Sequence, residues 1–261
     1  MSNERQDRAA RAEQMRRERD KADKRQRNGI TIAIVVVVLA LIAVGGFAIN
    51  KASNEGKRST ALVTPKNVNS DFAITYDATV AAGKAASSPV TVTLYEDFQC
   101  PACKAFEDAD GAFLRQAVDS GDITVEYRPI SFLDKASTTE YSSRALNAAM
   151  CVLDTKGVKS YTAMHDVLYA NQPAEGSAGL DDAKLGALAK EAGAGDLTAC
   201  IKSRKFDPWL HKATDASSKA GVNGTPTVMI NGKKVEGPAQ NGQPSLPRVG
   251  DLQKAIAAAK A

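Results

Sequence analysis

The chain has 261 residues, of which 43% are hydrophobic and 25% are charged, and these proportions are typical of a globular protein rather than a disordered one. Its net charge of +4 is unevenly placed, because residues 1–28 hold ten Lys/Arg and six Asp/Glu, and the remainder holds 24 residues of each sign. A neutral remainder argues against a nucleic-acid-binding surface in the folded part of the chain.

An apolar run follows the basic start. Residues 29–49 carry no charge over 21 positions, which is long enough to span a hydrocarbon core of about 30 Å. A cleaved signal peptide, the alternative, has a shorter apolar region and a small-residue cleavage site, and no good Ala-x-Ala site follows here. Eight Lys/Arg precede the run within twenty residues and four follow it, so the positive-inside rule favours a cytoplasmic N-terminus. We therefore expect a basic cytoplasmic tail over 1–28, a transmembrane anchor over 29–49 and an extracytoplasmic remainder, where disulfides are permitted.

Residues 50–70 are polar and are expected to form a linker. Beyond them, β-branched runs predict strands and amphipathic segments predict helices. The expected strands are 72–80 (on a sheet edge), 90–95, 123–130, 226–230 and 233–236. The expected helices are 102–118, 138–153, 158–170, 181–192, 196–203, 207–220 and 246–259.

The order of these elements predicts the fold class. A strand–helix–strand segment comes first, a block of helices follows, and a two-stranded segment with a closing helix ends the chain. Asn231-Gly232 between the last two strands predicts a hairpin. The arrangement indicates an α/β fold with a central sheet and a helical insertion.

Two thiols stand where the strand at 90–95 gives way to the helix at 102–118, in Cys100-Pro101-Ala102-Cys103. Unsatisfied N–H groups and the positive dipole end of a helix N-terminus stabilise a thiolate. Such positions lower a cysteine pKa from about 8.5 into the range of about 3.5 to 7.5. We therefore expect a redox pair, with Cys100 as the reactive thiolate and Cys103, one turn further on, as the resolving thiol.

Two other interpretations of Cys-x-x-Cys are weaker. A zinc site needs two more ligands at a suitable spacing, but there is no second Cys-x-x-Cys, and His165 and His211 are isolated in the sequence. No metal is therefore expected. A static disulfide between the two cysteines would close a very small loop and gain little chain entropy.

A second motif, Gly224-Thr225-Pro226-Thr227-Val228, precedes one of the late strands. Pro226 could simply start an edge strand. A cis peptide bond before Pro226 is the other interpretation, since cis X–Pro bonds are retained in tight turns. Beside a Cys-x-x-Cys helix, such a turn would expose the backbone of Thr225 for pairing with a substrate strand.

Taken together, Leu94-Tyr-Glu-Asp-Phe-Gln-Cys-Pro-Ala-Cys103 and Gly224-Thr-Pro-Thr-Val-Met-Ile-Asn-Gly232 resemble the bacterial DsbA-like thiol:disulfide oxidoreductases, in a membrane-tethered form. The resemblance covers about residues 70–261. It implies a thioredoxin fold with halves at about 71–132 and 205–261 and a helical insertion at about 133–204.

The resemblance also implies roles. Cys100 would form mixed disulfides, Cys103 would resolve them, and Thr225-Pro226 would be the cis-proline loop facing the pair. The substrates would be reduced or unfolded secreted proteins, and a membrane partner of the DsbB or vitamin K epoxide reductase type would reoxidise the pair. No cofactor would be needed, because sulfur holds the electrons.

The sequence departs from the family pattern at two positions. Thioredoxin-type proteins commonly carry a buried acid six residues before the first cysteine, where this chain has Leu94. Glu96 or Asp97 is therefore the candidate proton acceptor for Cys103, with a solvated charge at the strand end as the alternative. Strongly oxidising members often have His before the second cysteine, and Ala102 in its place predicts a less acidic Cys100 and a less oxidising pair.

Cys151 and Cys200 lie 49 residues apart in the helical block. An even cysteine count in an oxidising compartment predicts that they form a structural disulfide. A loop of that length would be worth about 4 kcal/mol in the chain-entropy model. Two buried free thiols and a second redox relay are the alternatives.

The function expected from these observations is disulfide exchange with secreted or cell-envelope proteins, most simply as an oxidase. A reductase or isomerase is the first alternative, because the direction depends on reduction potential and partners. A tethered peptide-binding chaperone with an inert disulfide is the second.

Overall fold

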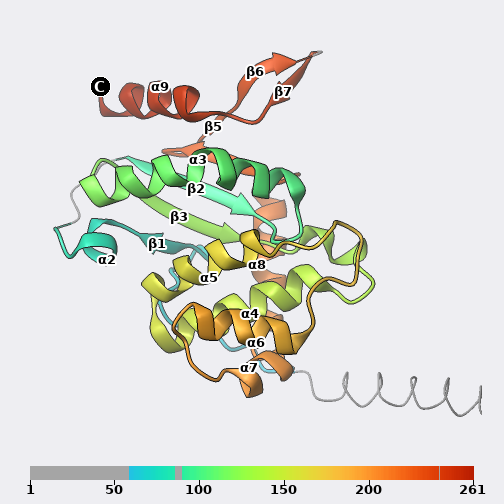
Figure 1. Cartoon of the computed structure of the whole chain (residues 1–261). Coiled ribbons are helices and arrows are strands. Elements are labelled where there is room, and N and C mark those ends of the chain that lie inside the picture. The colour runs from blue at the N-terminus through green and yellow to red at the C-terminus, as the bar shows by residue number, and fades with distance from the viewer. Residues whose placement is uncertain (1–58, 86–89, 241) are drawn as a thin grey trace, which may run out of the picture. The chain divides into compact units, whose positions relative to one another are not determined.

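The computed structural model describes residues 59–85, 90–240 and 242–261, which build a mixed sheet with helices packed against it (Figure 1). The expected tail and anchor lie outside these residues, as do positions 50–58 of the expected linker, whereas its positions 59–70 are described. Within the described part of the chain, no helix is both long and apolar enough to cross a bilayer.

The sheet has five strands in the order β1-β3-β2-β4-β5. The strands are β1 (Ile74–Tyr76), β2 (Thr91–Glu96), β3 (Thr124–Pro129), β4 (Thr227–Ile230) and β5 (Lys233–Val235). β2 and β3 run parallel, and the other neighbours are antiparallel. A parallel pair needs a crossover connection, which the long helix after β2 supplies. Asn231 and Gly232 join β4 to β5 with φ angles of 46° and 76°, as expected for an Asn-Gly hairpin.

Helices connect the strands in the expected order. They are α2 (Ala78–Ala82), α3 (Pro101–Ser120), the 3₁₀ helix η1 (Phe132–Lys135), α4 (Tyr141–Lys156), α5 (Val158–Ala170), α6 (Asp182–Glu191), α7 (Thr198–Lys202), α8 (Asp207–Lys219) and α9 (Val249–Lys260). Most boundaries lie within three residues of those predicted.

Two segments differ from the prediction. The strand expected over 72–80 ends at Tyr76, because the Asp77 carboxylate accepts hydrogen bonds from the amides of Thr79 and Val80 and caps α2 instead. The closing helix begins at Val249, because Pro247 disfavours a helical conformation at the residue before it. Before it, β6 (Gly237–Gln240) and β7 (Gln243–Ser245) form a separate hairpin, which the sequence did not predict.

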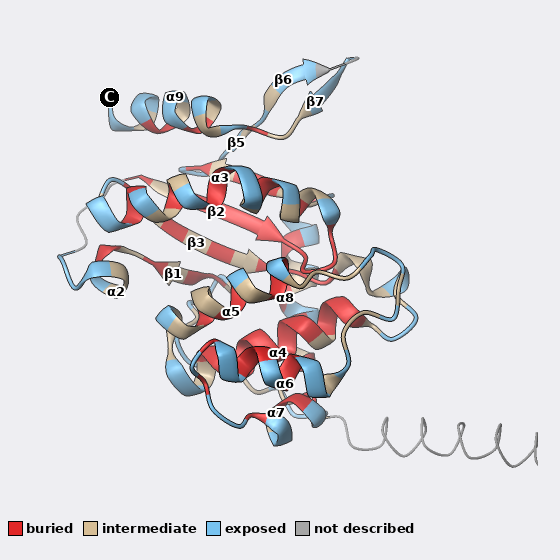
Figure 2. Cartoon of the chain, in the orientation of Figure 1, coloured by how far each residue is buried: buried red, intermediate tan, exposed pale blue. Residues whose placement is uncertain are grey.

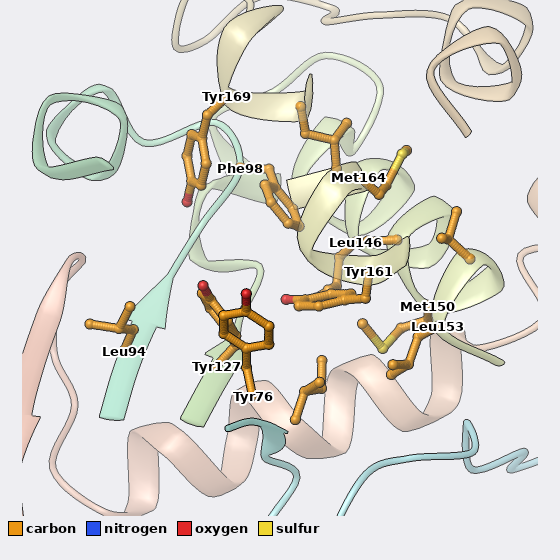
Figure 3. Close-up of a cluster of buried hydrophobic side chains, with 14 of the residues drawn as sticks. Tyr76, Leu94, Phe98, Tyr127, Leu146, Met150, Leu153, Tyr161, Met164 and Tyr169 are labelled. Atoms are coloured by element: carbon orange, nitrogen blue, oxygen red, sulfur yellow. The ribbon is translucent and has the colours of Figure 1, made fainter. Parts of the chain in front are cut away.

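One core serves both the sheet and the helices between β3 and α8 (Figure 2). Leu94 of β2 lies opposite Tyr127 of β3, and both side chains enter this core. Helix α4 is buried along most of its length. Figure 3 shows the packing of side chains from α4 and α5 (Leu146, Met150, Leu153, Tyr161, Met164 and Tyr169) beside the sheet residues. The expected insertion helices therefore belong to the same hydrophobic core as the sheet.

The other sheet face is covered more thinly. Alternation along β2 turns Tyr95 away from the main core, and it forms a small buried cluster with Ile130 and Val222.

A disulfide joins Cys151 of α4 to Cys200 of α7, the pairing that the even cysteine count predicts. Its Cα atoms are 6.1 Å apart, and the closed loop spans 49 residues. The disulfide fastens the short helix α7 to the buried helix α4.

Candidate active site

Cys100 occupies the N-cap position of α3, and Pro101 is the first residue of the helix. Proline suits this position because its fixed φ matches a helix and its missing N–H would have no intrahelical partner. The Cys100 amide donates to the carbonyl of Asp97 at 2.9 Å, which closes a tight turn after β2. This turn places the first thiol at the positive end of a twenty-residue helix.

The sheet brings the second motif to the same place. Tyr95 of β2 pairs with Thr227 of β4, so the loop before β4 lies beside the turn after β2. The Thr225–Pro226 peptide bond is cis, and the Cys100 thiol donates to the Thr225 carbonyl oxygen at 3.3 Å. Cys100 is 8% exposed and Cys103 is fully buried, and both are free thiols.

The two thiols differ strongly in acidity. The largest influence on the pKa of Cys100 is a hydrogen bond from the Cys103 side chain. Hydrogen bonds with Thr225 and from the amides of Cys103 and Ala102 act in the same direction. Together they outweigh the effect of burial and lower the pKa of Cys100 to about 6. The prediction that Ala102 makes Cys100 less acidic than in a Cys-Pro-His-Cys relative stays a prediction. Burial, the Cys100 side chain and the charge of Glu96 raise the pKa of Cys103 well above its ordinary value. At neutral pH the pair therefore consists of a Cys100 thiolate and a Cys103 thiol.

The loop that follows α5 forms hydrogen bonds with the turn between β2 and α3, which carries Cys100. The Gln172 side-chain amide donates to the carbonyls of Phe98 and Cys100, at 3.1 and 3.0 Å. The buried Gln99 side chain donates in turn to the carbonyls of Ala174 and Ser177. The sequence offered no sign of these contacts, because this loop is far from Cys100 along the chain.

Asp97, one of the two candidate proton acceptors, is fully buried and already hydrogen-bonded at both oxygens. Its Oδ1 atom accepts from the Gln99 amide at 2.8 Å and from the Ser142 hydroxyl at 2.6 Å. Its Oδ2 atom accepts from the Leu133 amide at 2.9 Å. Burial raises the pKa of Asp97 above its ordinary value. Asp97 therefore ties the active-site turn to η1 and α4.

Glu96, the other candidate, ends β2 and is 4% exposed. Its Oε2 atom lies 3.1 Å from Nε2 of His165, and its Oε1 atom is buried without a hydrogen-bond partner among the described residues. Its charge is one of the influences that raise the pKa of Cys103. Of the two acids, Glu96 thus has a carboxylate oxygen available and acts electrostatically on the resolving thiol.

Two further residues that the sequence did not single out complete this buried group. Glu107 of α3 has a side chain that is 8% exposed, and burial and the charge of Glu96 raise its pKa to about 8. Burial opposes the charge of His165, but Asp166 and Glu96 outweigh it and raise its pKa. Glu107 follows Cys103 by one helical turn, a spacing that could have indicated it, whereas only the tertiary structure brings His165 to Glu96.

Glu96, Glu107 and His165 are also the described residues best placed to hold a metal ion, since each offers a ligand atom within 4.8 Å of the others. Neither free thiol belongs to this group, so the expectation of no zinc on the Cys-x-x-Cys pair stays a prediction.

A groove adjoins the reactive thiol. Its volume is ≈ 390 Å³, and Thr225, Pro226, Met229 and Lys234 are among its lining residues. Cys100 is not among the lining residues, but its sulfur contacts the carbonyl of Thr225, which is one of them. The arrangement fits an extended polypeptide that presents its own thiol or disulfide to Cys100.

Residues 75–244 match the sequence profile of a family described as thioredoxin. The chain belongs to the thioredoxin family. The crystal structure of oxidised DsbA from Mycobacterium tuberculosis is 32% identical, with a TM-score of 0.54, and the match covers 72% of this chain and 99% of that one. Disulfide bond formation protein D of Bacillus subtilis is 26% identical over 153 residues, which cover 57% of this chain and 66% of that protein.

The serine/threonine-protein kinase PknE of M. tuberculosis is 34% identical over 150 residues, which cover 54% of this chain. The matched part is only 26% of the kinase, so the likeness concerns one segment of that protein. Together with the two free thiols beside the cis-proline loop, the matches to DsbA and to protein D place this thioredoxin-family chain among the DsbA-like thiol–disulfide oxidoreductases.

Proposed function

We propose that the chain oxidises paired cysteines of secreted or cell-envelope proteins through the Cys100–Cys103 couple. The observation that carries this proposal is the contrast between two adjacent thiols. Cys100 has a pKa of about 6 and touches the Thr225 carbonyl, whereas Cys103 is fully buried and has a raised pKa.

The reaction starts with the Cys100–Cys103 disulfide. A substrate thiolate attacks the Cys100 sulfur, a substrate–Cys100 disulfide forms, and Cys103 leaves as a thiolate that takes up a proton. A second substrate thiolate then attacks the substrate sulfur of this mixed disulfide and expels Cys100 as a thiolate. The substrate leaves with a disulfide, and the protein keeps the electron pair as a dithiol.

The acidity of Cys100 favours this direction, because it stabilises the reduced protein. At pH 7 a thiol with a pKa of about 6 favours the reduced form by about 1.4 kcal/mol over an ordinary thiol, or about 30 mV. The reactive thiol of thioredoxin has a pKa of about 7 and a potential of about −270 mV, and that of DsbA has a pKa of about 3.5 and a potential of about −120 mV. We expect an intermediate potential, below that of a Cys-Pro-His-Cys relative.

Glu96 is the proposed proton acceptor and donor for Cys103. Its Oε1 atom accepts no hydrogen bond from the described residues, whereas both Asp97 oxygens already accept hydrogen bonds. A positioned acid–base group of this kind contributes about 10²- to 10⁴-fold to a proton-transfer step.

The proposed location is the outer face of a cell membrane, with the chain anchored through residues 29–49. The apolar run and its asymmetric basic flanks support this location. The Cys151–Cys200 disulfide also supports it, because structural disulfides persist in oxidising compartments. A membrane oxidant of the DsbB or vitamin K epoxide reductase type would then return the dithiol to the disulfide.

The test is the oxidation of a client by the oxidised full-length protein. Reduced ribonuclease A should gain disulfides with the wild-type protein, and Cys100→Ser should abolish the reaction. Redox equilibration with glutathione gives the potential of the pair and separates an oxidase from a reductase. A Cys100→Ser protein that still acts on the client would support the peptide-binding alternative instead.

A further inference from the structure

A row of polar side chains leads from the buried end of β2 to the surface of α5. The Oε2 atom of Glu96 lies 3.1 Å from Nε2 of His165, and Nδ1 of His165 lies 3.6 Å from Oδ1 of Asp166. The side chains of Glu96 and His165 are 4% and 1% exposed, whereas that of Asp166 is 45% exposed. The row thus runs from a buried carboxylate past both nitrogens of one imidazole to a partly exposed carboxylate, and Nδ1 of His165 makes no hydrogen bond with the described residues.

Aromatic rings enclose the buried part of this row. The centroids of Tyr127 and Tyr169 lie 4.8 and 4.9 Å from that of His165, and those of Phe98 and Tyr161 lie at 5.8 and 6.3 Å. Figure 3 shows these four rings between the sheet and α5. Such packing leaves side chains, rather than bulk water, as the carriers of a proton through this region.

Other titratable and charged groups face His165 and Glu96 from each neighbouring element. Helix α3 contributes Glu107, Arg115 and the Cys103 thiol, and the Tyr127, Tyr161 and Tyr169 hydroxyls come from β3 and α5. Oε1 of Glu96, Oε1 of Glu107 and the Tyr161 hydroxyl are buried without hydrogen-bond partners among the described residues. Buried polar atoms without partners are uncommon in folded proteins, and each of these calls for a functional explanation.

We propose that Glu96, His165 and Asp166 carry the proton of the Cys103 thiol between the active site and solvent. Imidazole suits this task because it accepts a proton at one nitrogen and releases one from the other. The inference rests on the proposed function, because the proton is lost and gained by Cys103 only during disulfide exchange.

Asp166, where the proposed proton pathway reaches solvent, lies apart from the groove beside Cys100. A client joined to Cys100 would cover the groove beside Pro226, and the Cys103 side chain is fully buried. Asp166 forms an ion pair with Arg115 at 3.0 Å, and Arg115 lies fifteen residues beyond Cys100 along α3. At 1.5 Å per residue, the Cα atoms of these two α3 residues are about 22 Å apart along the helix axis. A proton can therefore pass through Asp166 while the client occupies the other opening.

The test mixes the reduced full-length protein with oxidised glutathione. The Cys100 thiolate attacks the glutathione disulfide, a mixed disulfide forms on Cys100, and one glutathione leaves as a thiolate. The Cys103 thiol gives its proton to Glu96, and its sulfur attacks Cys100. The Cys100–Cys103 disulfide forms, and glutathione leaves as a thiolate that is protonated by solvent. The rate of glutathione release is measured from pH 5 to 9 in stopped flow.

We expect Asp166→Asn and His165→Gln to slow glutathione release about tenfold or more at pH 7, within the range that positioned acid–base groups contribute. Added acetate, a small proton carrier, should partly restore the rate of Asp166→Asn. The thiolate titration of Cys100 should stay unchanged in both variants. Asp182→Asn is the matched control, because Asp182 also pairs with an arginine, Arg144, and has a side chain that is 35% exposed.

Asp166→Asn decides the question if the buried His165→Gln variant does not fold. Release rates of Asp166→Asn equal to those of Asp182→Asn at every pH would overturn the inference. A stoichiometric divalent metal in the purified protein that is lost in His165→Gln would also overturn it, because Glu96, Glu107 and His165 would then be ligands. A wild-type protein that forms no mixed disulfide with glutathione would contradict the proposed function itself.

Discussion

The Cys100 sulfur and the Thr225 carbonyl oxygen lie 3.3 Å apart, although 125 residues separate them in the chain. The pairing of β2 with β4 produces this contact, since it holds the turn before α3 against the loop before Thr227. A reactive thiol beside the Thr225 carbonyl and a cis proline is well placed to receive an extended substrate backbone.

Replacement of the resolving cysteine should trap substrates. Cys103→Ser leaves Cys100 able to attack but removes the thiol that releases the mixed disulfide, so covalent client adducts should accumulate. Non-reducing electrophoresis and mass spectrometry measure these adducts. Cys100→Ser/Cys103→Ser is the control, and adducts that persist in it would show that another thiol reacts.

Replacing Cys103 should also change the pKa of Cys100, because the hydrogen bond from the Cys103 side chain is the largest influence on that pKa. Titration of thiolate absorbance should give a pKa near 6 for the wild-type protein. Cys103→Ala should raise this pKa, and Cys103→Ser, which keeps a donor, should raise it less. A pKa that stays near 6 in both variants would assign the effect to the helix N-terminus alone.

The contribution of Cys100 to the stability of the reduced protein should grow as pH rises. The folded-state pKa of Cys100 is depressed to about 6, so its contribution is full above the unfolded-state pKa and is lost as pH falls through about 6. At pH 7 the contribution is about 1.4 kcal/mol. Denaturant unfolding of the reduced wild type and of Cys100→Ser at pH 5 and pH 7 measures it. The difference in stability between the two proteins should grow by that amount, and a difference that shrinks with rising pH would contradict the assigned acidity.

Ala102→His should make the pair more oxidising. A protonated imidazole next to the Cys100 sulfur stabilises the thiolate, and we expect a pKa lower by about one unit and a potential higher by about 30 mV. Glutathione equilibria measure the potential, and Ala102→Gln controls for side-chain size without the charge. A potential that does not rise would show that residue 102 does not reach the thiolate.

The Cys151–Cys200 disulfide should be structural rather than catalytic. Replacing both cysteines by alanine should lower the free energy of unfolding by about 4 kcal/mol in the chain-entropy model for a loop of this size. Disulfide exchange at Cys100 should continue in the folded fraction. Loss of exchange in a variant that remains folded would instead indicate a second redox relay.

The choice between the two candidate acids shows where sequence reasoning reached its limit. Glu96 and Asp97 are adjacent, and both were candidates on spacing alone. The structure separates them because Asp97 accepts from Ser142 and from the Leu133 amide, whereas Glu96 faces His165. These partners come from segments whose approach no local pattern encodes.

The sequence by itself determined the features that depend on neighbouring residues: the thiol pair at a strand–helix junction, the turn at Asn231-Gly232, and the order of strands and helices. Backbone preferences and hydrophobic periodicity act over a few residues, so a linear pattern carries them. The tertiary structure decided the β6–β7 hairpin, the cis bond before Pro226 and the burial of His165 against Glu96. Each of these depends on packing between distant segments, and packing is a property of the folded chain rather than of any short stretch of it.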